Sequence, residues 1–173
     1  MLFDASCVLA SRCQVLSSVA RTENSLSLLN KKIKKHGVTH HMLSVDWHDE
    51  FQFAQSIDKH IDAVGCPSLI LAWLHNHRLM HKIVAILSKY RVHCQLTQVH
   101  GSAAASPEKS RRYWLVQTPE HVIYKQVILG FRVEEGRSRW LTNQEISPGV
   151  VSAIDGPEEI NIVGQVEPWS LRP

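Results

Sequence analysis

Residues 17–37, SSVARTENSLSLLNKKIKKHG, predict a strand followed by a helix. Residues 14–20 have the pattern of a strand that ends just before Arg21. Leu26, Leu29 and Ile33 then recur at helical spacing, and Gly37 suits the left-handed residue that often ends a helix. Because this strand and helix lie so near the amino terminus, an earlier strand-helix unit has almost no room.

The same alternation of helix and strand continues on both sides of this stretch. Residues 67–75, PSLILAWLH, are continuously apolar, which is typical of a parallel strand covered on both faces. Regular alternation indicates an α/β fold with right-handed crossovers. The pattern predicts helices at residues 1–12, 22–36, 50–64 and 79–90, and strands at residues 14–20, 40–49, 67–75 and 92–101.

After Gly101 the pattern changes. Thr142 and Glu145 form a capping box that opens a helix, and Pro148 predicts a kink or a restart of that helix. With neither an internal repeat nor a linker, residues 1–173 are predicted to form a single domain. The other predicted segments are a polar loop at 102–112, a short strand or irregular edge at 113–117, a long β-rich run at 121–135 and a last strand at 159–169.

Composition excludes several classes of protein. The net charge is only +3, and apart from residues 31–35 and 109–112 the basic residues are spread out, so nucleic-acid binding is not predicted. The sequence has no apolar run near the roughly 20 residues of a membrane span and no secretory signal pattern. The four cysteines lack metal-binding spacing, and we interpret them as buried thiols of a protein in a reducing compartment. We therefore expect a cytoplasmic protein without a membrane partner.

The segments VART, LSVDWHD, LILAWLHN, TQVHGSA and VILGF, in this order, resemble the short-chain dehydrogenase/reductase family. LILAWLH, YKQVILGF and SRWLTNQEIS further resemble bacterial proteins that are labelled short-chain dehydrogenases without demonstrated substrates. The resemblance covers nearly the whole chain. It implies a Rossmann-like three-layer α/β sandwich with a mostly parallel sheet.

In that family the first strand ends in a glycine-rich turn that enters a helix, and Met1 and Leu2 match the last residue of that turn and the first of the helix. The resemblance therefore implies a truncated chain, without the first strand and the glycines that approach the dinucleotide pyrophosphate. None of the eight glycines forms G-x-G-x-x-G. Because the family's first strand lies between the second and the fourth, we expect two strands to face a gap with unpaired backbone groups.

The resemblance implies a nicotinamide dinucleotide cofactor. Arg21 stands where the family contacts the adenosine ribose, and a cation there suits a 2′-phosphate, hence NADP rather than NAD; the alternative is a solvated arginine. Asp46 matches an acidic residue near adenine. Ala72 begins AWLH, where the family commonly has N-A-G beside the nicotinamide. The histidines at 75, 77 and 81 are interpreted as surface residues, and no metal site is predicted.

For catalysis, the resemblance implies that Ser102 hydrogen-bonds a substrate carbonyl; the alternative is a loop serine without a partner. The family's Tyr-x-x-x-Lys is absent, since neither Tyr113 nor Tyr124 has a lysine four places later. Tyr124 is the remaining candidate tyrosine. The alternative interpretation is that Tyr124 is a structural residue of a strand and that Lys125 lies in solvent, because adjacent strand residues point to opposite faces.

Three hypotheses for function follow. The first is a dinucleotide-binding protein with little or no oxidoreductase activity, whose ligands are the dinucleotide and a small carbonyl substrate. The second is a non-catalytic interaction module that uses an exposed sheet edge, or the region of the packing anchors Trp140 and Trp169, for a partner or for homo-oligomerisation. The third is an NADP-dependent reductase in a full-length form that uses Ser102 and Tyr124.

Overall fold

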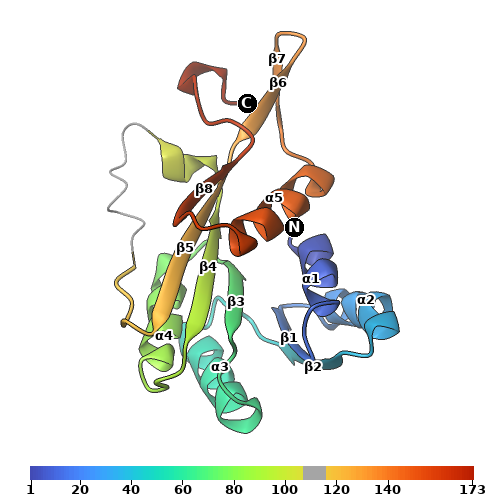
Figure 1. The fold of residues 1–173 in the computed structure, drawn as a ribbon, viewed down its shortest axis with the longest axis vertical. Coiled ribbons are helices and arrows are strands. Elements are labelled where there is room, and N and C mark those ends of the chain that lie inside the picture. The colour runs from blue at the N-terminus through green and yellow to red at the C-terminus, as the bar shows by residue number, and fades with distance from the viewer. Residues whose placement is uncertain (107–115) are drawn as a thin grey trace.

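The computed structural model describes residues 1–106 and 116–173 (Figure 1). The basic run 109–112 and most of the segment predicted at 113–117 lie outside the described residues. Helices and strands alternate up to β4, as predicted. In chain order the elements are α1 (Phe3–Ala10), β1 (Val15–Ala20), α2 (Glu23–Ile33), η1 (Lys34–His36), β2 (Thr39–Ser44), α3 (Glu50–Val64), β3 (Leu69–Trp73), α4 (His77–Leu87), β4 (Cys94–His100), η2 (Ser102–Ala105), β5 (Val122–Leu129), β6 (Phe131–Glu134), β7 (Arg137–Trp140), α5 (Asn143–Asp155), β8 (Ile160–Val163) and η4 (Trp169–Leu171).

The parallel strands form two separate sheets. One sheet has the order β3-β4-β5-β8, and the other contains β1 and β2 alone. Every pair in both sheets is parallel. Within the described part of the chain, β1 and β3 each have one strand partner, so both keep an unpaired edge. The mostly parallel α/β fold is confirmed, and so is the expected break between these two strands.

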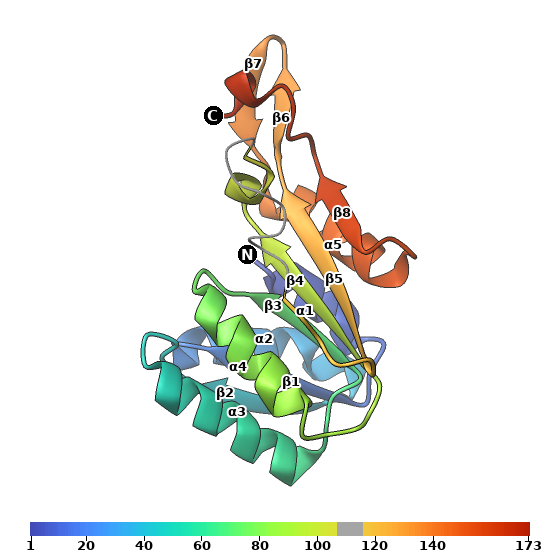
Figure 2. The same cartoon turned by 90° about the vertical axis from the view of Figure 1, so that its left-hand side faces the viewer.

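Helices cover both faces of the strands (Figures 1 and 2). An apolar cluster that includes Phe53, Ile61 and Leu79 places α3 and α4 on one face. A second cluster places α5 on the other face, through Val150 and Val151, together with α1. The three-layer sandwich is thus the observed arrangement.

Local sequence signals explain several boundaries. The Asp49 carboxylate accepts hydrogen bonds from the amides of Phe51 and Gln52 at 3.1 and 2.9 Å, which starts α3 at Glu50 as predicted. Gly37 has a φ of 68° and follows the 3-10 turn that ends α2. This left-handed conformation carries little cost for glycine.

The predicted β-rich run 121–135 is confirmed as β structure, and it forms two strands. It divides at Gly130 into β5, which belongs to the main sheet, and β6, which pairs with β7 in an antiparallel hairpin. The hairpin projects beyond the sheet at the upper end of Figure 1. Glu135 and Gly136 both have positive φ, 51° and 75°, which is the backbone twist that a tight hairpin turn favours.

Three smaller expectations also need correction. Pro148 lies inside α5 and neither ends nor restarts it. The cysteines are not uniformly buried, because Cys94 is buried but Cys13 is exposed. Trp140 is 46% exposed, so it is not a packing anchor of the core.

Candidate functional site

The loops after parallel strands meet at one edge of an α/β sheet, which is where ligands of such folds usually bind. At this carboxyl edge the structure places Arg21 after β1, Asp46 after β2 and Ser102 after β4. Ala72 and Tyr124 lie inside strands instead. Of the five predicted site residues, three therefore lie at the carboxyl edge and two lie within strands.

Arg21 and Asp46 lie on neighbouring loops. The Arg21 guanidinium carbon is 5.5 Å from the centre of the Trp47 ring, a cation–π contact. The Asp46 carboxylate accepts hydrogen bonds from the amide and the Nδ1 of His48, at 3.0 and 2.7 Å. These bonds, with a smaller contribution from Arg21, hold the pKa of Asp46 below its usual value. The result is an exposed, positioned cation beside an ionised carboxylate.

Ala72 is buried and is the last residue but one of β3. It pairs with Gln98 of β4 and packs in the cluster beneath α3 and α4. The strand continues to Trp73, whose indole N–H donates to His75 Nε2 at 3.1 Å. The bulky rings of Trp73 and His75 therefore follow Ala72, at the place where the family commonly has the small residues of N-A-G.

Ser102 is buried in the turn after β4 and has a partner from the far end of the chain. Arg172 Nε donates to the Ser102 hydroxyl oxygen at 2.7 Å. The same guanidinium lies 4.9 Å from the centre of the Trp140 ring and 5.2 Å from that of Trp169. The two tryptophans thus hold the arginine that engages Ser102, a role that their sequence context does not indicate.

Tyr124 is not brought together with Ser102. Its partner in the sheet is Leu96, whereas β4 continues to His100 opposite Ile128, so the backbone of Tyr124 lies about 13 Å along the strands from the level of His100. The Tyr124 hydroxyl donates to Gln98 Oε1 at 2.5 Å. Burial raises its pKa to about 12, which keeps the phenol protonated near neutral pH.

Lys125 points to the opposite face from Tyr124, as strand geometry predicts, but the expectation that it lies in solvent is wrong. It is 7% exposed. Its ammonium donates to the carbonyls of Ala153 and Ile154, at 3.4 and 3.0 Å, and also to that of Gly156. These carbonyls end α5, so the lysine caps a helix instead of serving a reaction.

Sequence analysis missed a row of buried polar side chains on β4 and β5. Gln98, His100 and Gln126 are all buried, and Gln126 Nε2 lies 3.4 Å from His100 Nε2. Burial, with a smaller effect of His77, lowers the pKa of His100 to about 4, so the ring is neutral at physiological pH. The signal was the presence of three polar residues in LTQVH, which is unusual for a central parallel strand.

The histidines near α4 do not gather. His77 and His81 stack edge to face with ring centres 4.6 Å apart, while His75 contacts Trp73. Among the described residues, no group of three or more His, Cys, Asp or Glu side chains could hold a metal ion. Nor does any helix in that part of the chain have the length and apolarity to cross a membrane.

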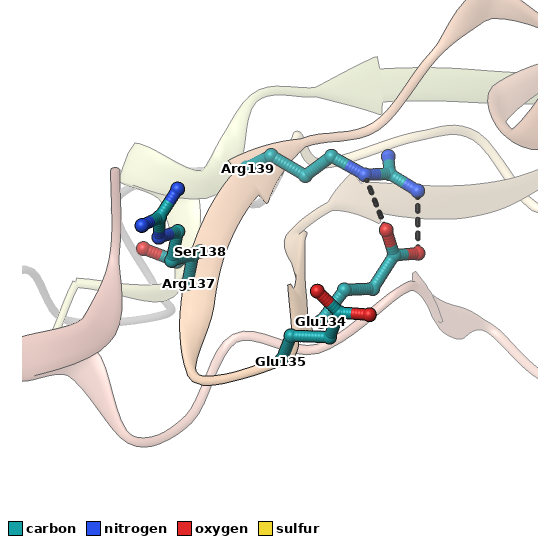
Figure 3. Close-up of a pocket in the computed structure, with 5 residues that line it drawn as sticks. All are labelled: Glu134, Glu135, Arg137, Ser138 and Arg139. Carbon is teal, nitrogen blue, oxygen red and sulfur yellow. Dashed lines mark hydrogen bonds and ion pairs between the residues drawn. The ribbon is translucent and has the colours of Figure 1, made fainter.

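A charged hollow lies at the hairpin (Figure 3). Arg139 donates to Glu134 through Nε and a terminal nitrogen, at 3.0 and 2.6 Å, and to Glu145 through both terminal nitrogens. Arg132 Nε is 2.9 Å from Glu145. Glu145 also accepts from the Thr142 amide at 2.8 Å. Its bonds to Arg139 and then Thr142 lower its pKa from 4.5 to about 2.

This carboxylate links stability to pH. Because the pKa of Glu145 is lower in the folded chain, its contribution is present above pH 4.5 and is lost as the pH falls toward 2. We expect Glu145→Gln to melt at a lower temperature than the wild type at pH 7, with the difference shrinking toward pH 2. Melting temperatures measured between these limits test this, with exposed Glu159→Gln as the control. A constant difference across the range would contradict it.

Comparison with known proteins identifies the fold. No protein-family model and no curated protein matches the chain. Among solved structures, an NADH-dependent reductase A1-R′ complexed with NAD superimposes with a TM-score of 0.70 at 12% identity, covering 94% of this chain and 89% of that one. The bulky-bulky ketone specific alcohol dehydrogenase from Comamonas testosteroni has a TM-score of 0.68 at 12% identity, with coverages of 97% and 85%.

A short-chain dehydrogenase/reductase from Serratia marcescens is also similar, with a TM-score of 0.64 at 12% identity, covering 94% of this chain and 92% of that one. At identities this low, the similarity shows the fold alone. The chain therefore has the Rossmann-like fold of short-chain dehydrogenase/reductases.

Proposed function

We propose that the chain binds a nicotinamide dinucleotide through its adenosine end, at the loops after β1 and β2, and has little or no oxidoreductase activity. The observation that carries the proposal is the pairing of Arg21, held against Trp47, with Asp46 on the neighbouring loop. An exposed guanidinium suits a 2′-phosphate, so NADP is favoured over NAD. The similar reductase that binds NAD supports a dinucleotide in this fold.

The residues fit only part of such a cofactor. Arg21 and Asp46 suit the ribose phosphate and the adenine side, but no G-x-G-x-x-G is present to bind the pyrophosphate. Affinity is therefore expected to be modest. The bound cofactor would carry the hydride chemistry, and the chain's own part is to hold and orient the adenosine end.

The predicted catalytic residues are poorly disposed for a reaction. Arg172 engages Ser102, which would otherwise be free to bind a small carbonyl substrate. Tyr124 donates to Gln98 within the sheet. We expect weak or no turnover for this reason. The described cysteines are free thiols, which fits our proposal of a cytoplasmic location.

Replacing Arg21 with alanine tests the proposed site. We expect NADPH to bind the wild type saturably, and Arg21→Ala to weaken NADPH about tenfold, which is the loss of about one charge-assisted hydrogen bond. The affinity for NADH, which lacks the 2′-phosphate, should change much less in this variant. Fluorescence titration with both nucleotides measures this.

The matched control is Arg91→Ala, which removes an exposed arginine before β4, at the opposite edge of the sheet. It should bind both nucleotides as the wild type does. The absence of saturable binding up to millimolar NADPH would exclude the proposal. Equal losses for NADPH and NADH would remove the preference for NADP.

The second candidate is an interaction module without catalysis. The unpaired edges of β1 and β3 favour it, because exposed strand edges bind other strands. Dinucleotide binding distinguishes the two candidates, since a pure interaction module has no affinity for NADPH.

A further inference from the structure

Arg172 is held in one orientation by three other side chains. Its Nε donates to the hydroxyl oxygen of the buried Ser102 at 2.7 Å. Its guanidinium carbon lies 4.9 Å from the ring centre of Trp140 and 5.2 Å from that of Trp169. An exposed arginine usually samples many rotamers and loses that freedom when it binds a partner. The folded chain has already fixed this side chain, so a ligand of Arg172 binds at a small further cost in entropy.

The two terminal nitrogens of this guanidinium remain available. A guanidinium has five N–H donors, and Ser102 accepts from the one on Nε. Within residues 1–106 and 116–173, neither terminal nitrogen of Arg172 has an acceptor, and every ion pair involves another cation. The nearby carboxylates of the hairpin, Glu134 and Glu145, are bound by Arg139. In that part of the chain, the charge of Arg172 is therefore without a counter-ion.

Three segments that are far apart in the sequence meet at this arginine. Ser102 begins η2 after β4, Trp140 ends β7, and Trp169 begins η4. In Figure 2 these segments lie at the upper end of the main sheet, where β4 ends. Ligands of parallel α/β folds usually bind at this carboxyl edge. The fixed cation thus stands at the edge where the fold favours a ligand.

The available donors match a carboxylate. The two terminal nitrogens of an arginine can donate in parallel to both oxygens of one carboxylate, and such paired, charge-assisted bonds are stronger than neutral ones. Trp140, beside them, is 46% exposed, so part of its ring is open to the body of a ligand. An aromatic carboxylate supplies both parts, an anionic group for the guanidinium and a flat apolar ring for the tryptophan.

We propose that Arg172 anchors a binding site for aromatic carboxylates, with Ser102, Trp140 and Trp169 as its positioning residues. The carboxylate accepts from both terminal nitrogens of Arg172, and the ring of the ligand packs on Trp140. In this arrangement Ser102 holds the arginine and does not bind a substrate carbonyl. The inference does not rest on dinucleotide binding, because neither loop of the proposed cofactor site takes part in it.

Arg21 provides an internal comparison. It also lies on a tryptophan, with its guanidinium carbon 5.5 Å from the ring centre of Trp47. Within the described residues, however, the side chain of Arg21 has neither a second ring nor a hydrogen bond to hold it. A carboxylate that binds any arginine on a tryptophan would bind at both places alike. Binding that depends on a fixed guanidinium favours Arg172.

The experiment titrates the full chain with benzoate, without nucleotide, and follows the indole N–H signals of the tryptophans by NMR. We expect the signals of Trp140 and Trp169 to shift saturably, with a dissociation constant on the order of 1 mM. The signals of Trp47 and Trp73 should stay unchanged. An equal shift at Trp47, or the absence of saturation by about 20 mM benzoate, would overturn the proposal.

Three further compounds test the two parts of the ligand. Benzamide has the ring without the charge, acetate has the carboxylate without the ring, and inorganic phosphate is an anion of another shape. Each should bind at least about fivefold more weakly than benzoate, because each loses the paired ionic bonds or the contact with Trp140. If benzamide bound equally well, the site would be merely apolar. If acetate or phosphate did, it would be a general anion site. Either result would contradict the proposal.

Variants test the role of the arginine itself. Arg172→Gln should weaken benzoate binding at least about tenfold, and Arg172→Lys, which keeps the charge without the planar fork, at least about fivefold. The matched control is Arg137→Gln, which removes an exposed arginine of the hairpin with the same change in net charge and should bind as the wild type does. Circular dichroism establishes that the variants are folded. Wild-type affinity in either Arg172 variant, or an equal loss in Arg137→Gln, would exclude the proposed site.

Discussion

Replacing Gly130 with alanine is expected to lower the free energy of unfolding by about 3 kcal/mol. A Cβ at this position would lie 2.0 Å from the carbonyl oxygen of Gln165 and 2.6 Å from its carbonyl carbon. Both are backbone atoms, so no side chain can rotate away. Phe131 and Gln165 also exchange backbone hydrogen bonds at 2.8 and 2.9 Å, and Gly130 donates to Val163 at 2.9 Å. The alanine must therefore push the backbone of Gln165, which follows β8, away from the end of β5.

Urea unfolding followed by circular dichroism measures this loss. Gly101→Ala is the matched control, because a Cβ there meets nothing within 4 Å and its φ of −73° suits any residue. The control should stay within about 0.5 kcal/mol of the wild type. If Gly130→Ala lay in the same range, the close approach to Gln165 would not exist in solution.

Lys125→Met is expected to destabilise the chain by a similar amount, about 3 kcal/mol. The ammonium supplies donors to the last carbonyls of α5, which have no donors within the helix, and its charge complements the negative end of the helix dipole. Methionine keeps most of the volume but donates nothing. The buried carbonyl of Ala153 and the partly buried carbonyl of Gly156 would then lose a partner, while Ile154 keeps the bond from Gln95 at 3.0 Å.

The matched control for this change is Lys59→Met. Lys59 lies on the exposed side of α3, where its ammonium donates to Gln55 at 3.3 Å. Loss of that exposed contact should cost at most about 0.5 kcal/mol. Hydrogen exchange adds a local readout, because amides near the end of α5 should exchange faster in Lys125→Met. Equal stability of the two variants would show that the buried lysine is not needed.

Elements with strong local signals were predictable from sequence. Helix α3 has the predicted bounds, because Asp49 caps it and its apolar residues recur at helical spacing. Strand β7, and with it the hairpin that it forms with β6, was missed, since RSRW is too polar to show a buried face. Charged contacts between Arg139 and the two glutamates hold it instead. Such pairing depends on side chains that meet only after the turn forms.

The candidate site was predictable to a smaller degree. Arg21 and Asp46 lie where a residue after a parallel strand must lie, at the carboxyl edge. The engagement of Ser102 by Arg172 could not be predicted, because the two residues are 70 positions apart and no sequence pattern links them. The same holds for Lys125, whose burial depends on where α5 ends.

Sequence by itself determined the order of helices and strands up to β4 and the parallel α/β class. Those properties follow from local periodicity and chain order, which act over a few residues at a time. Only the tertiary structure decided which polar groups are buried together and what engages Ser102. These depend on contacts between distant segments, and such contacts exist only once the helices have packed over the strands.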